Sequence, residues 1–213
     1  MAVLVLDPDL ESHLKAVRRE NDSDGHDEVW EGLHVMAPLP NDDHQDIQAS
    51  FLAMLREALG WDTPAKFRAG VNVSDRHKDW QFNYRTPDVV AYLPGNPAKN
   101  FATHWQGGPD FLIEIVSSFD RSREKLAFYG KVGVREALFI DRDPWELEFY
   151  VASKKAGASL RLAGKTKMKG VPLSSSVLPL TFALVPGKPR PRIEVILTSP
   201  TAKTTSSRRQ WLI

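Results

Sequence analysis

The segment 109–116 constrains the fold more than any other part of the sequence. It is short, rich in β-branched and aromatic residues, and bounded by Gly107-Gly108 and Ser117-Ser118, which predicts a buried β-strand. Glu114 interrupts this apolar run. Because burial of an unpaired carboxylate costs several kcal/mol, we expect Glu114 to be paired, protonated or bound to a metal ion.

The composition fits one domain of ordinary size. With 213 residues, 42% of them hydrophobic, the chain can build a core without cross-links. It has no cysteine, which excludes disulfides, thiolate zinc sites and cysteine nucleophiles. A net charge of +1 does not indicate a strongly basic nucleic-acid binder, although it does not exclude a local basic patch. The apolar stretch 3–6 is too short for a signal peptide or a membrane span, so we expect a soluble, cytoplasmic protein without a membrane partner.

Hydrophobic periodicity predicts a mixed α/β (α+β) domain with one central mixed β-sheet flanked by helices. The expected helices cover 7–19, 43–59 and 120–132. The expected strands cover 28–36 (two short strands turning at Glu31-Gly32), 66–74, 87–93, 109–116, 135–141, 145–151, 178–185 and 192–197. We expect an N-terminal helical extension at 1–26, one domain at 27–197, and a polar, mobile tail at 198–213.

A second acidic residue, Asp88, opens the predicted strand that precedes the Glu114 strand. Neighbouring strands of one sheet would place the two carboxylates a few ångströms apart. Mg²⁺ favours one or two carboxylates completed by water and substrate phosphate. Without a cation, the two groups would repel and one would take up a proton.

Lys125 is a third candidate, because the helix 120–132 begins directly after the Glu114 strand. Its long side chain can reach back toward that strand. An ammonium beside a phosphate can orient the nucleophile or stabilise developing negative charge.

Several segments resemble a known nuclease family. The segment 86–90 resembles the first half of the PD-(D/E)XK nuclease signature, and 111–118 resembles the second half as it occurs in the Uma-two family of restriction endonucleases. The same pattern continues in 28–32, His44, 120–129, 133–141 and 176–180. The similarity covers roughly residues 27–185, and 109–141 is its most specific part.

The resemblance implies a restriction-endonuclease-like core with Asp88 and Glu114 as metal ligands and the carbonyl of Ile115 as a further ligand. The superfamily pattern places a lysine at the position of Val116, whereas the resembled family takes it from the next helix, which implies Lys125 as the catalytic lysine. The implied activity is hydrolysis of phosphodiester bonds in nucleic acid, DNA in the first instance. The implied cofactor is Mg²⁺, with Mn²⁺ as a substitute.

Auxiliary residues and assembly are less constrained. His44, Glu28 and Glu31 are the candidates for an assisting acid or base, and Tyr129 either lines the site or packs against the sheet.

Since cleavage of both strands of a duplex commonly needs two active sites, a homodimer is one expectation, although no heptad or interface stripe supports it.

Structural and functional alternatives stay open. Glu114 could belong to a buried ion pair with Lys125 or an arginine, and Lys125 could lie on a solvated helix face. The aromatic and basic segment 76–85 could contact nucleic acid or form an exposed loop. The chain could also be a catalytically silent member that binds nucleic acid or protein, or a metal-dependent hydrolase of a small phosphorylated molecule.

Overall fold

The computed structural model describes residues 3–22, 24–117, 121–198 and 209–213. Its helices are α1 (Pro8–Glu20), α2 (Asp42–Leu59) and α3 (Leu126–Val132), with 3₁₀ turns η1 (Trp80–Phe82) and η2 (Ser122–Lys125). Its strands are β1 (Val3–Leu4), β2 (Glu28–Trp30), β3 (Leu33–Met36), β4 (Lys66–Ala69), β5 (Val73–Ser74), β6 (Tyr84–Arg85), β7 (Val89–Tyr92), β8 (Lys99–Asn100), β9 (Trp105–Gln106), β10 (Phe111–Val116), β11 (Glu136–Arg142), β12 (Trp145–Val151), β13 (Arg161–Thr166), β14 (Leu173–Ser174), β15 (Leu180–Val185), β16 (Arg192–Leu197) and β17 (Gln210–Leu212).

A six-stranded mixed sheet forms the centre of the molecule, with strand order β13-β12-β11-β10-β7-β4. β10 and β11 are parallel, with Phe111 opposite Glu136, and the other neighbours are antiparallel. The connection between the two parallel strands contains α3, as a crossover between parallel strands requires. The predicted central mixed sheet is therefore confirmed.

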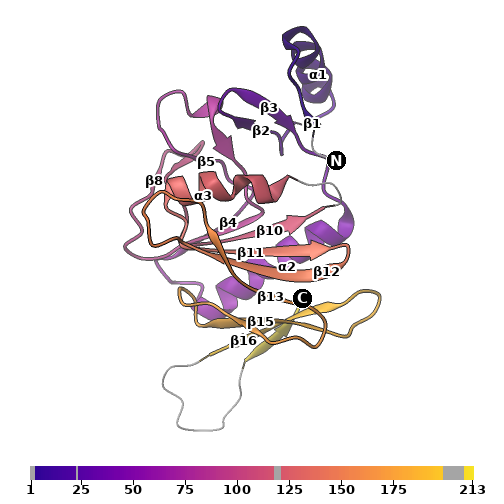
Figure 1. The fold of residues 1–213 in the computed structure, drawn as a ribbon, viewed down its shortest axis with the longest axis vertical. Coiled ribbons are helices and arrows are strands. Elements are labelled where there is room, and N and C mark those ends of the chain that lie inside the picture. Colours follow the sequence, from indigo (N-terminus) through magenta and orange to yellow (C-terminus); the bar gives the residue numbers. More distant parts are fainter. Residues whose placement is uncertain (1–2, 23, 118–120, 199–208) are drawn as a thin grey trace.

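The two faces of the central sheet are covered by different elements (Figure 1). On one face, α2 and the strands β15 and β16 pack around a core that includes Phe51, Ile113 and Phe182. On the other face, α3 covers a second apolar cluster that includes Leu112 and Phe128. All six residues of β10 are buried because the strand lies between these two layers.

The predicted long helix is confirmed as α2. The side chain of Asn41 accepts a hydrogen bond from the amide of His44 at its N-terminus, and Gly60 follows its last residue with φ of 97°. Its apolar stripe, which includes Ile47, Phe51 and Leu55, is buried against the central sheet.

A second sheet lies beside α3, with strand order β1-β3-β2-β6-β5-β9-β8. Figure 1 shows β2 and β3 above α3, and α1 projecting farther from the body. No residue of α1 is buried. None of the described helices is long and apolar enough to cross a membrane.

Several sequence expectations need correction. The predicted helix at 120–132 begins as the 3₁₀ turn η2 and becomes α-helical at Leu126, while 118–120 lie outside the described residues. The segment 94–108 contains β8 and β9, although no strand was expected there, and β13 was not expected either. The end of the predicted mobile tail forms β17, which pairs with β16, and 199–208 lie outside the described residues. The β13 pattern is polar because this strand occupies an edge of the sheet, and it pairs on one side.

Candidate functional site

Strand register brings Asp88 and Glu114 together. Val89 of β7 lies opposite Ile113 of β10 in an antiparallel pair, so the preceding Asp88 lies opposite Glu114. Because side chains alternate along a strand, Glu114 points to the face that carries Leu112, on the α3 side of the sheet. Asp88 lies just before β7, and its carboxylate contacts His44 of α2. Asp88 and Glu114 line one cavity of about 90 Å³.

Asp88 is held by protein donors on both of its oxygens. The amide of Ile115 donates to Oδ2 at 2.6 Å, and Nε2 of His44 lies 3.2 Å from Oδ1. The side chain of Gln48, also on α2, donates to the Asp88 carbonyl at 2.8 Å. α2 therefore fixes the position of Asp88 through two of its side chains.

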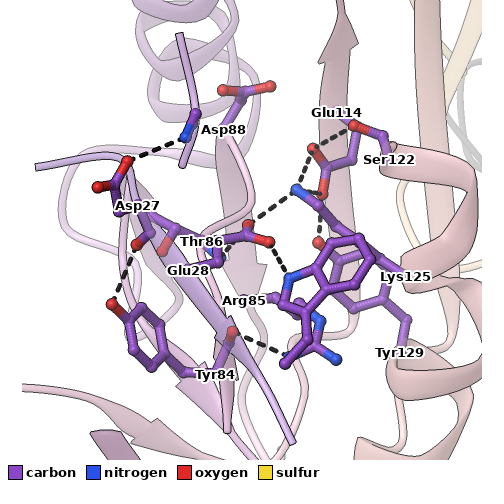
Figure 2. Close-up of polar contacts among 12 residues, drawn as sticks. Asp27, Glu28, Tyr84, Arg85, Thr86, Asp88, Glu114, Ser122, Lys125 and Tyr129 are labelled. Atoms are coloured by element: carbon purple, nitrogen blue, oxygen red, sulfur yellow. Dashed lines mark hydrogen bonds and ion pairs between the residues drawn. The ribbon is translucent and has the colours of Figure 1, made fainter. Parts of the chain in front are cut away.

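Glu114 is 3% exposed and accepts hydrogen bonds from three side chains. Nζ of Lys125 lies 3.2 and 3.3 Å from its two oxygens, and the hydroxyl of Ser122 lies 3.4 Å from Oε2. The Tyr129 hydroxyl donates to Oε1. Figure 2 shows these groups converging on the carboxylate from η2 and α3.

Lys125 links Glu114 to the second sheet. Its Nζ lies 2.8 Å from Oε1 of Glu28 on β2, so the ammonium stands between two buried carboxylates (Figure 2). Glu28 is itself positioned by the indole of Trp30 at 2.6 Å and the amide of Thr86 at 2.8 Å. Since Lys125 is 8% exposed, the alternative of a solvated helix face is wrong. The expected ion pair between Glu114 and Lys125 is present within this site.

The charges around Glu114 perturb its titration. Burial raises the pKa of Glu114, the Lys125 ammonium lowers it, and the negative charges of Asp88 and Glu28 raise it again, to about 8 in total. The same burial, with Glu114 beside it, raises the pKa of the Tyr129 hydroxyl well above its ordinary value, so this group stays a donor. Without a cation, burial and the neighbouring carboxylates therefore favour the protonated form of Glu114, and the Lys125 ammonium opposes them.

The remaining wall of the cavity includes residues that sequence reasoning missed. Trp30 lines it, and two guanidinium groups lie over its ring, Arg85 at 4.7 Å and Arg121 at 5.6 Å from the centroid. Ser122 was also missed as a Glu114 partner. For Trp30 the signal was available, since it lies in the matched segment 28–32. Ser122 carried no signal distinct from that of an ordinary helix start.

Of the other candidates from the sequence, three lie at the site and one does not. Glu28, His44 and Tyr129 contact the core residues described above. Glu31 does not line the cavity: its carboxylate is 62% exposed, accepts from Asn83 at 2.8 Å and lies 3.4 Å from Arg76. Its expected proximity to the site is therefore wrong, because the β2–β3 turn directs it outward. Among the described residues, no three or more His, Asp or Glu side chains form a ready cluster of metal ligands.

Comparisons with known proteins identify the family of the chain and support its fold. The model of the Uma2 family, described as "Putative restriction endonuclease", matches residues 13–184. A crystal structure of a "putative nuclease" from Anabaena variabilis ATCC 29413 superposes with a TM-score of 0.52 at 18% identity, over 64% of this chain and 75% of that chain. A search of curated proteins finds no match.

The match to the family covers most of the chain and includes every segment that supplies a side chain to the cavity. The likeness to the solved structure supports the fold independently, since few residues are shared. The chain belongs to the Uma2 family of restriction-endonuclease-like proteins.

Proposed function

We propose that the protein is a divalent-metal-dependent endonuclease that hydrolyses phosphodiester bonds in DNA, with Mg²⁺ as its cofactor and Mn²⁺ as a substitute. One observation carries the proposal. Asp88, Glu114 and Lys125 come from three different elements and line the same cavity, with the ammonium held between Glu114 and Glu28. A buried charge cluster at the edge of a cleft is costly for folding and is typical of a working site.

The donor set suits a hard divalent cation. Asp88 and Glu114 both line the cavity, and so does Ile115, the residue after Glu114 on β10, whose carbonyl is the further candidate ligand. The negative charges of Asp88 and Glu28 help to raise the pKa of Glu114. A cation bound by Asp88 and Glu114 would offset the repulsion between these two carboxylates. Asp88, Glu114 and Ile115 are the residues that would hold the metal.

Each protein group has a distinct role in this proposal. The cation, when bound, would supply Lewis-acid polarisation of the scissile phosphodiester and activation of water. Lys125 places a positive charge where negative charge develops in the transition state. Glu28 and Glu114 hold that ammonium from opposite sides, and His44 keeps Asp88 in place from α2.

The size of the cavity favours a polymer over a small phosphorylated molecule. Small-molecule sites commonly enclose roughly 300–1,000 Å³, whereas this cavity holds about 90 Å³. It has room for an ion and a few water molecules. A nucleic-acid strand would lie across its opening and present one phosphate to the carboxylates.

The direct test is a cleavage assay on metal-stripped protein with duplex, single-stranded and branched DNA. We expect cleavage on addition of Mg²⁺ or Mn²⁺, and a loss of about 100-fold or more in rate for Asp88→Asn, Glu114→Gln and Lys125→Met. Glu31→Gln is the matched control, since this carboxylate is exposed and lies outside the cavity. Rates of the three site variants equal to the wild-type rate would refute the proposal.

Two further measurements separate the alternatives. Calorimetry that shows no Mg²⁺ or Mn²⁺ uptake at millimolar concentration, together with DNA binding, would favour a catalytically silent binding protein. Light scattering of the intact protein, with and without DNA, tests the proposed homodimer, which would bring two cavities to the two strands of a duplex.

A further inference from the structure

Two lysine or arginine side chains line the cavity among the described residues, and they differ in exposure. Lys125 is 8% exposed, and its ammonium is bound between Glu114 and Glu28. The side chain of Arg121 is 31% exposed. A side chain that lines a cavity and also reaches solvent lies at the opening. Arg121 therefore brings a positive charge to the opening of the cavity, whereas Lys125 lies inside.

The guanidinium of Arg121 is held in place by two neighbours. Its central carbon lies 5.6 Å from the centre of the Trp30 ring, and Nε and Nη2 donate to the two oxygens of Glu124 at 2.9 and 2.6 Å. Within the part of the chain that the structure describes, Nη1 has no acceptor. Because a guanidinium carries its N–H groups in one fixed plane, Arg121 is oriented by the protein and still has donors for a ligand.

The charges that line the cavity would repel a phosphate. Asp88, Glu114 and Glu28 all line it, and the one cation inside, Lys125, is already bound by two of these carboxylates. Arg121 forms its ion pair with Glu124 instead, which is 53% exposed and does not line the cavity. Since exposed ion pairs contribute little stability, a phosphate could share or replace Glu124 at small cost.

The backbone places Arg121 close to the carboxylates but not on them. Arg121 directly precedes Ser122, whose hydroxyl lies 3.4 Å from Oε2 of Glu114. Within the described residues, Arg121 forms no ion pair with Asp88, Glu114 or Glu28. Its position therefore suits a phosphate next to the one that the carboxylates would receive.

We propose that Arg121 binds a backbone phosphate of the DNA strand, next to the phosphodiester that is cleaved, and so holds the strand across the opening of the cavity. The inference rests on the proposed nuclease function for the identity of the strand. Arginine suits this role because its planar fork can donate two parallel hydrogen bonds to one phosphate. Phosphate contacts fix the position of a protein on nucleic acid without reading its bases, so Arg121 would act on any sequence.

Binding can be measured without cleavage, by fluorescence anisotropy of a labelled DNA duplex in buffer with chelator. We expect Arg121→Ala to weaken binding about tenfold, because hydrogen bonds to charged groups are stronger than neutral ones. The same variant should flatten the dependence of log K on log salt by about 0.9, the value for one phosphate contact. Arg121→Lys keeps the charge without the fork, so it should keep the salt dependence and recover part of the affinity.

An arginine elsewhere on the surface provides the matched control. Arg19 is 78% exposed on α1 and does not line the cavity. Arg19→Ala should leave both the affinity and its salt dependence unchanged. Arg121→Ala should keep the Tm of the wild type, because it removes only an exposed ion pair and a ring contact at the surface.

Cleavage kinetics in Mg²⁺ separate a neighbouring phosphate from the reacting one. Arg121→Ala should raise KM and leave kcat nearly unchanged, because the contact is the same in the bound substrate and in the transition state. Equal affinity and equal salt dependence of wild type and Arg121→Ala would overturn the inference, even in a protein that cleaves DNA. A lower kcat at unchanged KM would overturn the assignment to a neighbouring phosphate. Binding that depends on Arg121 in a protein without cleavage would leave the phosphate contact standing and refute the nuclease proposal alone.

Discussion

Glu148 connects the turn that carries Lys125 to the central sheet. It lies on β12 with its side chain 2% exposed, and it accepts from Arg123 at 2.9 Å, from the Tyr150 hydroxyl at 2.7 Å and from Lys165. Arg123 belongs to η2, the turn that ends at Lys125, and it also contacts Asp141 at 2.7 Å. Replacement of this carboxylate by an amide of the same size should therefore weaken both the fold and the support of the site.

The expected loss follows from the titration of Glu148. Burial alone would raise the pKa of its carboxyl, but hydrogen bonds from Arg123, Lys165 and Tyr150 outweigh burial and lower the pKa from 4.5 to about 2. That difference corresponds to about 3 kcal/mol of stability at neutral pH. The side chains of Arg123 and Lys165 are 41% and 43% exposed, so solvent screening reduces the expected contribution to about 2 kcal/mol. Since the folded-state pKa is depressed, this stability is present above pH 4.5 and is lost as the pH falls toward 2.

Urea denaturation of Glu148→Gln at pH 7, 5 and 3 tests this reasoning. We expect the variant to be about 2 kcal/mol less stable at pH 7, a shift in Tm of about 4–8 °C, and we expect the difference to shrink below pH 4.5. Glu124→Gln is the control, because this carboxylate is 53% exposed and its pair with Arg121 should contribute less than about 1 kcal/mol. Equal stability at pH 7, or a deficit that does not change with pH, would refute the assignment of the stability to the ionised carboxylate.

Two other substitutions test the packing around the site. Gly130→Ala would place its Cβ 1.9 Å from the carbonyl oxygen of Ala158, so we expect thermal denaturation to show a loss of about 3 kcal/mol in the free energy of unfolding. Gly25→Ala has open space around it and should have little effect. Tyr129→Phe removes the hydroxyl that donates to Glu114 and should lower the unfolding free energy by about 1–2 kcal/mol and slow cleavage; an unchanged cleavage rate would show that Tyr129 serves packing alone.

Helices and strands with a clear hydrophobic periodicity could be predicted from the sequence. The helix α2 and the strand β10 have enough residues for their apolar patterns to stand out, and the resulting sheet order places Asp88 beside Glu114. β5, β8 and β9 have two residues each, too few to show a period, and their pairing depends on distant segments. The contact between Glu28 and Lys125 was not predictable for the same reason, since it joins β2 of the second sheet to a turn packed on the central one.

Val116 occupies the lysine position of the superfamily pattern, and the 3₁₀ turn η2 places Lys125 beside Glu114. Val116 points to the same face of β10 as Glu114 but is 4% exposed and packs within the apolar cluster that includes Phe128, so an ammonium there would be buried among apolar groups. In a 3₁₀ turn, side chains three residues apart lie on the same side, whereas in an α-helix they diverge by about 60°. Ser122 and Lys125 are such a pair, and both contact Glu114. The 3₁₀ turn thus brings the Ser122 hydroxyl and the Lys125 ammonium to one carboxylate, and Glu28 holds the ammonium from the other side.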